Sequence, residues 1–285
     1  MAGSVEKLLE LLEIEQLDVD LFRGAQPETE RQRVFGGQVA AQALVAASRS
    51  ADPEFELHSL HSYFLRPGDH LVPIIYRVER IRDGRSFETR RVVALQHGRE
   101  IYSQTCNFQK PEDGYEHSDQ APVVGRPEEG LSLADLAAAR SEKELRHWQH
   151  EWAGLDIRHM GMSGHGLEVD PARPAEARLW VKVDGALPDD PVLQKAAFTY
   201  ASDLTLIGAS LVPHGIHINS PKLQPASLDH TIWFHRPLRA DDWWLYDQTS
   251  PSASGGRGLS LARVFASDGT LAATVAQEGL IRRIG

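Results

Sequence analysis

Asp203 is a carboxylate on a run of residues that is otherwise apolar. It falls in the segment 191–211, which predicts a helix, and helical spacing places it on the same face as Tyr200 and Ile207. An unpaired carboxylate on such a face would be unfavourable by roughly several kcal/mol, so Asp203 should have hydrogen-bonding partners or a raised pKa. A structural or solvent-facing aspartate is the alternative, and periodicity alone does not decide between them.

Gln277 is a second polar side chain in apolar surroundings. Alternation along the predicted strand 270–281 places it on the face of Leu271, Ala273 and Val275. A glutamine on an inward face usually hydrogen-bonds a specific group, which can be a ligand or simply a neighbouring core amide. Ser227 opens the apolar run that leads to the preceding strand, and by itself it is only a serine near a strand start.

Other chemistries have weaker support. Cys106 is the only cysteine, so no intrachain disulfide can form, and its place in a predicted strand favours an inert, buried thiol. The glycine-rich run 252–258 could contact a phosphate, but a turn is the simpler interpretation. None of the three His-x-x-His pairs has a third ligand nearby, so we expect no metal site. The pairs are His58/His61, His147/His150 and His214/His217. The sequence has neither a Walker A motif nor a dinucleotide-binding fingerprint, so we expect no cofactor.

Composition narrows the function classes. The formal net charge is −10, from 30 basic and 40 acidic residues, which argues against nucleic acid as a partner. The chain lacks a run of about 18 apolar residues, so we predict no membrane span. The N-terminal residues lack the basic region and apolar core of a signal peptide, so we expect a cytoplasmic location.

The chain repeats itself. Phe64-Leu65-Arg66-Pro67 is matched by Phe234-His235-Arg236-Pro237 at an offset of 234 − 64 = 170, and Gly98 is matched by Gly269 at an offset of 171. After each Phe-x-Arg-Pro segment, two strand-like runs flank a glycine turn, as in a β-hairpin. The runs are 86–95 and 101–108 in the first copy, and 258–265 and 270–281 in the second.

A predicted helix precedes the strands of each copy. In the first copy Gly36-Gly37-Gln38 leads into the alanine-rich run 39–47; in the second, Asp190 is a suitable N-cap and Pro191 suits the first helical position. We therefore predict an α+β protein of two like modules, 1–110 and 155–285. The segment 111–154 would be a linker with one bridging helix over about 132–152.

Four segments carry a family likeness: Val34–Val39 (VFGGQV), His58–Asp69 (HSLHSYFLRPGD), Tyr200–Leu204 (YASDL) and Trp233–Pro237 (WFHRP). Together they resemble the acyl-CoA thioesterase II (TesB-type) family. The likeness extends from about Leu8 to Arg282 and is weakest over about 120–178.

The resemblance implies a double hot-dog fold, in which each module is a long helix wrapped by an antiparallel sheet. It implies hydrolysis of fatty acyl-CoA to fatty acid and CoA by direct water attack, with Asp203, Ser227 and Gln277 as the catalytic trio. Ser227 stands where the family commonly has threonine. Gly36, Gly37, Gln38 and His61 are assigned an oxyanion or substrate-binding role, with the helix start as the physical reason for the two glycines.

The resemblance also implies a single site per chain, because the first predicted helix contains no aspartate, and a homo-oligomer, expected to be a tetramer. Two alternatives stay open: a non-catalytic acyl-CoA-binding module and a hot-dog enoyl-CoA hydratase. The hydratase chemistry needs an Asp and a His a few residues apart, whereas no histidine follows Asp203 until His214.

Overall fold

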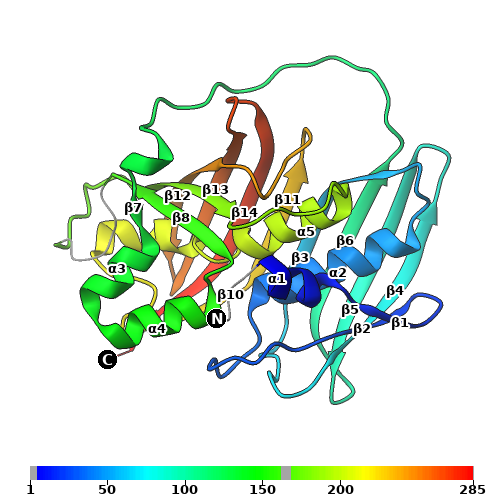
Figure 1. Cartoon of the computed structure of the whole chain (residues 1–285), viewed down its shortest axis with the longest axis horizontal. Helices are drawn as coiled ribbons and strands as arrows, with labels where there is room; N and C mark the ends of the chain where they lie inside the picture. Colours follow the sequence, from blue (N-terminus) through cyan, green and yellow to red (C-terminus); the bar gives the residue numbers. More distant parts are fainter. Residues whose placement is uncertain (1–4, 162–167, 285) are drawn as a thin grey trace.

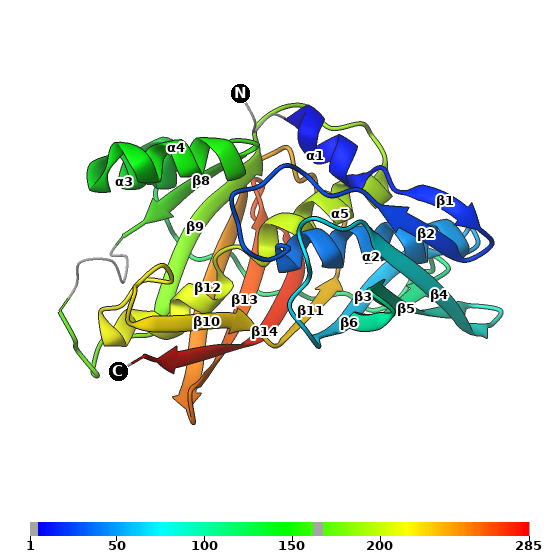
Figure 2. The same ribbon diagram turned by 90° about the horizontal axis from the view of Figure 1, so that it is seen from below.

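One curved antiparallel sheet wraps around two buried helices (Figures 1 and 2). This computed structural model describes residues 5–161 and 168–284. The two central helices are α2 and α5, and the shorter α1, α3 and α4 lie outside the sheet. The helices are α1 (Val5–Leu12), α2 (Gly36–Ser50), α3 (Leu133–Arg140), α4 (Glu142–Glu151) and α5 (Pro191–Ser202), with 3₁₀ helices η1 (Pro127–Glu129) and η2 (Leu206–His214).

The sheet runs in the order β1-β2-β4-β5-β6-β3-β11-β14-β13-β12-β9-β8-β7, and β10 pairs with β14 outside this path. Strands of the N-terminal half therefore occupy one end and strands of the C-terminal half the other. The first half has β1 (Glu15–Asp18), β2 (Leu21–Gly24), β3 (Glu56–Phe64), β4 (Ile74–Asp83), β5 (Phe87–Gln96) and β6 (Arg99–Gln109). The second has β7 (Leu131–Ser132), β8 (Leu155–Met160), β9 (Glu176–Val183), β10 (Leu223–Ser227), β11 (Asp229–Phe234), β12 (Trp244–Ser254), β13 (Arg257–Ala266) and β14 (Leu271–Arg283).

The two halves join edge to edge through β3 and β11. These strands pair antiparallel, with Tyr63 opposite Asp229 and Ser59 opposite Trp233. The Phe-x-Arg-Pro segments thus end two neighbouring strands at the centre of the sheet. The predicted α+β, double hot-dog architecture is confirmed.

Glycine turns close the hairpins where the sequence predicts them. His97 and Gly98 adopt positive φ values of 50° and 70° between β5 and β6, and Gly269 has a φ of 86° between β13 and β14. In the glycine-rich run 252–258, Gly255 and Gly256 have φ values of 56° and 75° and turn the chain from β12 into β13. The turn interpretation of that run is confirmed.

Helix α2 lies in the core along most of its length. Its alanines from Ala40 to Ala47 are fully buried, and small side chains allow the helix to approach both the sheet and α5 closely. The start of α2 meets the end of α5, because a β-carbon added to Gly37 would lie 2.3 Å from the backbone oxygen of Tyr200. The two helices therefore bring the Gly36-Gly37 pair to the end of α5.

The prediction that the second helix continues to Leu211 is wrong. α5 ends at Ser202, and after a short turn the chain forms the 3₁₀ helix η2, which contains Pro213. The Tyr246 hydroxyl donates to the Ser202 carbonyl at 3.0 Å, taking the acceptor that a continuing α-helix would use. Pro213 also lacks the N–H that a longer helix would require. Ile207 is buried, as expected, but in η2 rather than on α5.

The connection between the halves also differs from the prediction. Residues 110–126 form neither helix nor strand and arch along one side of the molecule (Figure 1). The single helix predicted over 132–152 is two helices, because Ser141 is extended (φ −171°, ψ 156°). Ser132 and Ser141 cap α3 and α4 in turn, each accepting a backbone N–H. Within the described part of the chain, no helix is long and apolar enough to cross a membrane.

Candidate active site

Asp203 lies directly after the last residue of α5 and is almost fully buried, with 7% of its surface exposed. Its backbone is still α-like (φ −77°, ψ −13°), so the side chain continues the buried face of the helix that Tyr200 occupies one turn earlier. Asp203 therefore lies in the apolar surroundings that its spacing predicts, and its carboxylate has several hydrogen-bond partners there.

Ser227 and Gln277 both donate to the same oxygen of Asp203. The Ser227 hydroxyl lies 3.0 Å from Oδ1, and the Gln277 side-chain amide donates to Oδ1 as well. Ser227 ends β10 and Gln277 lies on β14, so the three side chains come from separate parts of the second half. Gln277 is fully buried, and its Oε1 has no hydrogen-bond partner among the described residues.

The pKa of Asp203 is raised from 3.8 to about 6. Burial is the main cause, because it disfavours the charged form. The hydrogen bonds from Gln277, Ser227 and the backbone N–H of Gly37 act in the opposite direction and keep the shift from being larger. The result is a carboxyl group that changes charge close to neutral pH.

The start of α2 faces this carboxylate. The side chain of the N-cap residue Phe35 makes no hydrogen bond to the helix start, and the Gly37 N–H donates to the Asp203 carboxylate instead. A β-carbon on Gly36 would lie 2.6 Å from Asp203 Oδ2 and 2.8 Å from the Phe64 ring. Only glycine allows this close approach.

Gln38 is buried but turns away from Asp203. Its amide donates to Gln26 Oε1 at 2.8 Å and to the Ala25 carbonyl at 3.4 Å. One turn further along α2, Gln42 donates to the same Ala25 carbonyl at 3.2 Å. Gln38 therefore anchors the segment before α2, and the structure does not bring it to the carboxylate.

His61 is also away from the trio. Its neighbours Leu60 and Ser62 are buried on the inner face of β3, whereas His61 is exposed on the outer face and packs edge-on against Trp233 at 5.3 Å. Cys106 is fully buried, and burial raises the pKa of its thiol to about 12, as expected for an inert thiol.

A buried histidine contacts the residue before Asp203 and is not among the site residues predicted from the sequence. His230 Nε2 lies 2.8 Å from the hydroxyl of Ser202, the residue before Asp203, and its ring is fully buried. Burial lowers its pKa to about 3, so the ring is neutral. Ser62 donates to its carbonyl at 2.7 Å. Alternation with the buried Ile232 and Phe234 could have identified His230 as an inward polar residue.

This arrangement can hold a water molecule against a base. A buried carboxylate with a pKa near neutral can accept a proton, and the hydroxyl and amide beside it can orient a small polar molecule. No cluster of three or more His, Cys, Asp or Glu side chains suited to a metal ion occurs in the ranges 5–161 and 168–284.

Two fused modules, with a polar cluster at the end of the second central helix, define a double hot-dog protein. Family models described as "Acyl-CoA thioesterase" and "Acyl-CoA thioesterase N-terminal domain" match residues 171–280 and 25–109. Acyl-CoA thioesterase 2 of Haemophilus influenzae is 39% identical over 99% of both chains. Acyl-coenzyme A thioesterase 8 of Homo sapiens is 37% identical, covering 95% of this chain and 88% of that protein.

A solved structure shows the same family relationship. The acyl-CoA thioesterase II TesB2 of Mycobacterium marinum is 42% identical with a TM-score of 0.81, over 97% of this chain and 98% of that one. The chain therefore belongs to the acyl-CoA thioesterase family, in its TesB-type branch, and is a thioester hydrolase.

Proposed function

We propose that the chain hydrolyses fatty acyl-CoA to free fatty acid and CoA by direct attack of water, with Asp203 as the general base. The water oxygen bonds to the thioester carbonyl carbon while its proton passes to Asp203. When the tetrahedral intermediate collapses, the C–S bond breaks and the CoA sulfur leaves, taking a proton back. Asp203 is restored, and no covalent enzyme intermediate forms.

The convergence of three donors on one carboxylate supports this assignment. Ser227, Gln277 and the Gly37 N–H surround Asp203, and Gln277 Oε1 remains free to accept a hydrogen bond from the attacking water. A pKa near 6 leaves Asp203 mostly ionised at neutral pH, yet more basic than an exposed aspartate. Ser227 and Gln277 would orient the water.

For the oxyanion we propose the start of α2, where the N–H groups and the positive end of the helix favour negative charge. Gly36 would supply the N–H for this role, because the Gly37 N–H already donates to Asp203. We do not include Gln38, which bonds to Gln26, or His61, which lies on the outer face of the sheet.

The test is release of free thiol from a panel of acyl-CoA thioesters, from butyryl to stearoyl, with Asp203→Asn as the matched control. We expect thiol with the wild-type chain and a loss of roughly 10²–10⁴-fold in kcat for the variant. Binding of acyl-CoA without thiol release would favour the binding module. Hydration of an enoyl-CoA without thiol release would favour the hydratase.

We further propose that the chain works in the cytoplasm as a homo-oligomer, a tetramer by family resemblance. The outer face of the central strands exposes large side chains at Tyr63 and Trp233, which association would cover. Light scattering that gives the mass of one chain would contradict the oligomer. Cell fractionation tests the location.

A further inference from the structure

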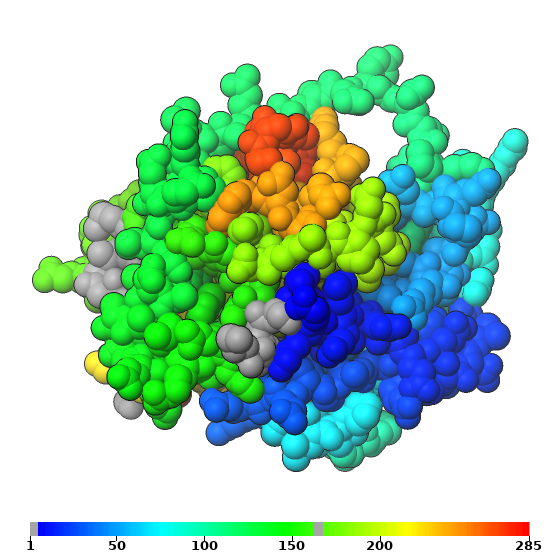
Figure 3. Space-filling model, in the orientation of Figure 1, coloured from blue at the N-terminus to red at the C-terminus, as the bar shows by residue number. Residues whose placement is uncertain are grey.

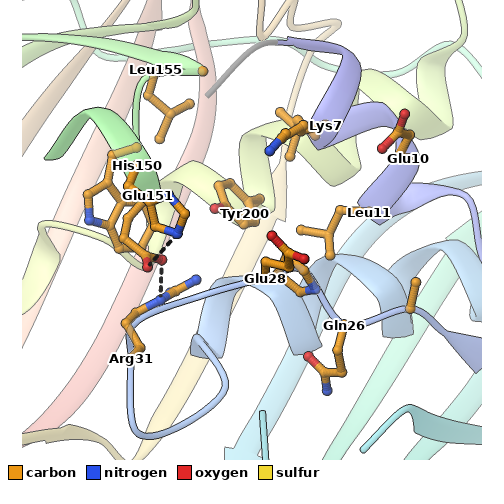
Figure 4. A pocket seen from close by; sticks show the side chains of 15 residues that line it. Lys7, Glu10, Leu11, Gln26, Glu28, Arg31, His150, Glu151, Leu155 and Tyr200 are labelled. Carbon is orange, nitrogen blue, oxygen red and sulfur yellow. Dashed lines mark ion pairs between the residues drawn. The ribbon is translucent and has the colours of Figure 1, made fainter. Parts of the chain in front are cut away.

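A pocket of about 310 Å³ opens near the site but outside the trio (Figure 4). It lies between α1, the segment 25–31 and the end of α4. Its wall is apolar at Leu8, Leu11, Leu155, Trp152 and Tyr200. In the space-filling view, α1 (dark blue) lies against α5 (yellow-green) on the same face of the molecule (Figure 3). The pocket is thus built largely by elements outside the two central helices.

Tyr200 connects this pocket with Asp203. Its side chain forms part of the pocket wall, and it precedes Asp203 by one helical turn. Phe35, directly before Gly36, packs edge-on against Tyr200 at 5.1 Å and against Trp152 at 4.8 Å. These ring contacts therefore join the residue before α2 to two side chains of the pocket wall.

The pocket mouth is held by a hydrogen-bonded ion pair. The buried Glu151 carboxylate accepts from the Thr29 hydroxyl at 2.8 Å and the Glu30 N–H at 2.9 Å. It also pairs with Arg31 Nε at 2.8 Å (Figure 4). The Arg31 guanidinium also stacks over Trp152, with 4.7 Å between its carbon and the ring centre. These contacts fix the segment 25–31 to the end of α4.

Charge at the mouth indicates which end of acyl-CoA fits. Glu10, Glu28 and Glu151 line the pocket together with Lys7 and Arg31, and Arg31 is already paired with Glu151. Three carboxylates against two cations give these five side chains a formal charge of −1. Such a rim does not attract the phosphates of CoA, whereas the apolar wall suits a hydrocarbon chain.

We propose that this pocket receives the distal part of the acyl chain and that its wall sets the preference for chain length. The inference rests on the proposed hydrolysis of acyl-CoA. A long acyl chain would pass along Phe35 and Tyr200 and end against Leu8, Leu11 and Trp152. A short acyl chain would end before the pocket.

Ala25→Phe tests this by filling the mouth. Ala25 lines the pocket and is exposed, so a larger side chain there would take up pocket space. We expect the ratio of kcat/KM for palmitoyl-CoA to that for butyryl-CoA to fall about tenfold, the effect of displacing about two buried methylene groups. Leu71→Phe, which adds a ring at a side chain that is 77% exposed and outside the pocket, is the matched control and should keep the wild-type ratio.

A second measurement does not depend on turnover. Titration calorimetry with a non-hydrolysable palmitoyl thioether of CoA should show weaker binding to Ala25→Phe than to wild type, with equal binding of CoA alone. A wild-type chain that hydrolyses acyl-CoA, combined with an unchanged substrate ratio and unchanged thioether binding in Ala25→Phe, overturns the inference. A wild-type chain that releases no thiol from any acyl-CoA overturns the proposed function instead.

Discussion

At the Asp203 carboxylate, burial and hydrogen bonding have opposite effects on the pKa, and burial is stronger. The folded pKa of about 6 lies above the ordinary 3.8. For an acid with a raised pKa, the folded state binds the proton more tightly, so ionisation destabilises the fold. The free energy of unfolding therefore falls by about 3 kcal/mol as pH rises from near 4 to near 6, and this contribution does not change further above that range.

Asp203→Asn should therefore separate activity from stability. Activity should be lost, while the free energy of unfolding at about pH 8 should rise by up to about 3 kcal/mol, because asparagine carries no buried charge. Below about pH 4, where Asp203 is protonated, the two proteins should be equally stable. Urea unfolding at both pH values measures this. A variant that is less stable at about pH 8 would contradict the buried, ionised carboxylate.

The dependence of kcat/KM on pH should also follow the charge of Asp203. kcat/KM should fall as pH drops through about 6, because a protonated Asp203 cannot accept a proton from water. Ser227→Ala removes a hydrogen bond that lowers the pKa of Asp203, so the midpoint should move to higher pH. The exposed Ser118→Ala is the control, with an unchanged profile. A midpoint that Ser227→Ala does not move would argue against the Ser227–Asp203 contact.

Candidate site residues could be predicted where their own segment of sequence marks them. Asp203 and Gln277 could be found because each interrupts an apolar face in its own segment. Ser227 has no such signal, and only the family resemblance indicated it. His61 was assigned from a motif, but alternation along β3 places it on the outer face, since neighbouring residues of a strand point to opposite sides.

At the scale of elements, the approach of α2 to α5 depends on Gly36 and Gly37. Gly37→Ala would place a β-carbon 2.3 Å from the Tyr200 backbone oxygen, so the start of α2 would have to move away from Asp203. We expect at least about tenfold loss of kcat together with a lower Tm, because overpacking typically costs about 1–3 kcal/mol. Gly208→Ala is the matched control, since no atom lies within 4 Å of its added β-carbon. Equal losses of kcat and Tm in both variants would show that the close contact between Gly37 and Tyr200 does not cause them.

Elements whose signals are local were predicted better than those that depend on tertiary contacts. The hairpin turns at Gly98 and Gly269, and the Asp190 cap of α5, follow from the nearby residues alone. The end of α5 at Ser202 does not, because the Tyr246 hydroxyl that takes its carbonyl is 44 residues away. The short β1 is exposed along its whole length and has no alternation to detect.

At the scale of the whole molecule, duplication has produced two unlike halves. Phe64 pairs with Tyr102 and Phe234 with Ala273, so Cys106 and Gln277 each lie four residues beyond the paired position. Their offset, 277 − 106 = 171, is that of the repeat. The first half thus presents a buried thiol where the second presents the amide, and α2 contains no acidic residue.

The position that corresponds to Ser227 is also changed. Leu57 stands there, at an offset of 227 − 57 = 170, and its carbonyl accepts from the Lys195 ammonium at 2.9 Å. Burial lowers the pKa of Lys195, and Glu56, 3.9 Å away, acts in the opposite direction. A cation and an aliphatic side chain therefore occupy the place where the second half has the Ser227 hydroxyl beside the Asp203 carboxylate.

One binding site per chain is the expected consequence. Titration of Asp203→Asn with a non-hydrolysable acyl-CoA thioether should give one ligand per chain, because the first half lacks the aspartate, the hydroxyl and the amide together. Cys106→Gln in the Asp203→Asn background should restore no hydrolysis, since a glutamine without a base cannot activate water. Two equivalent ligands per chain would show that the first half retains a binding site. The two modules would then differ in catalysis but not in binding.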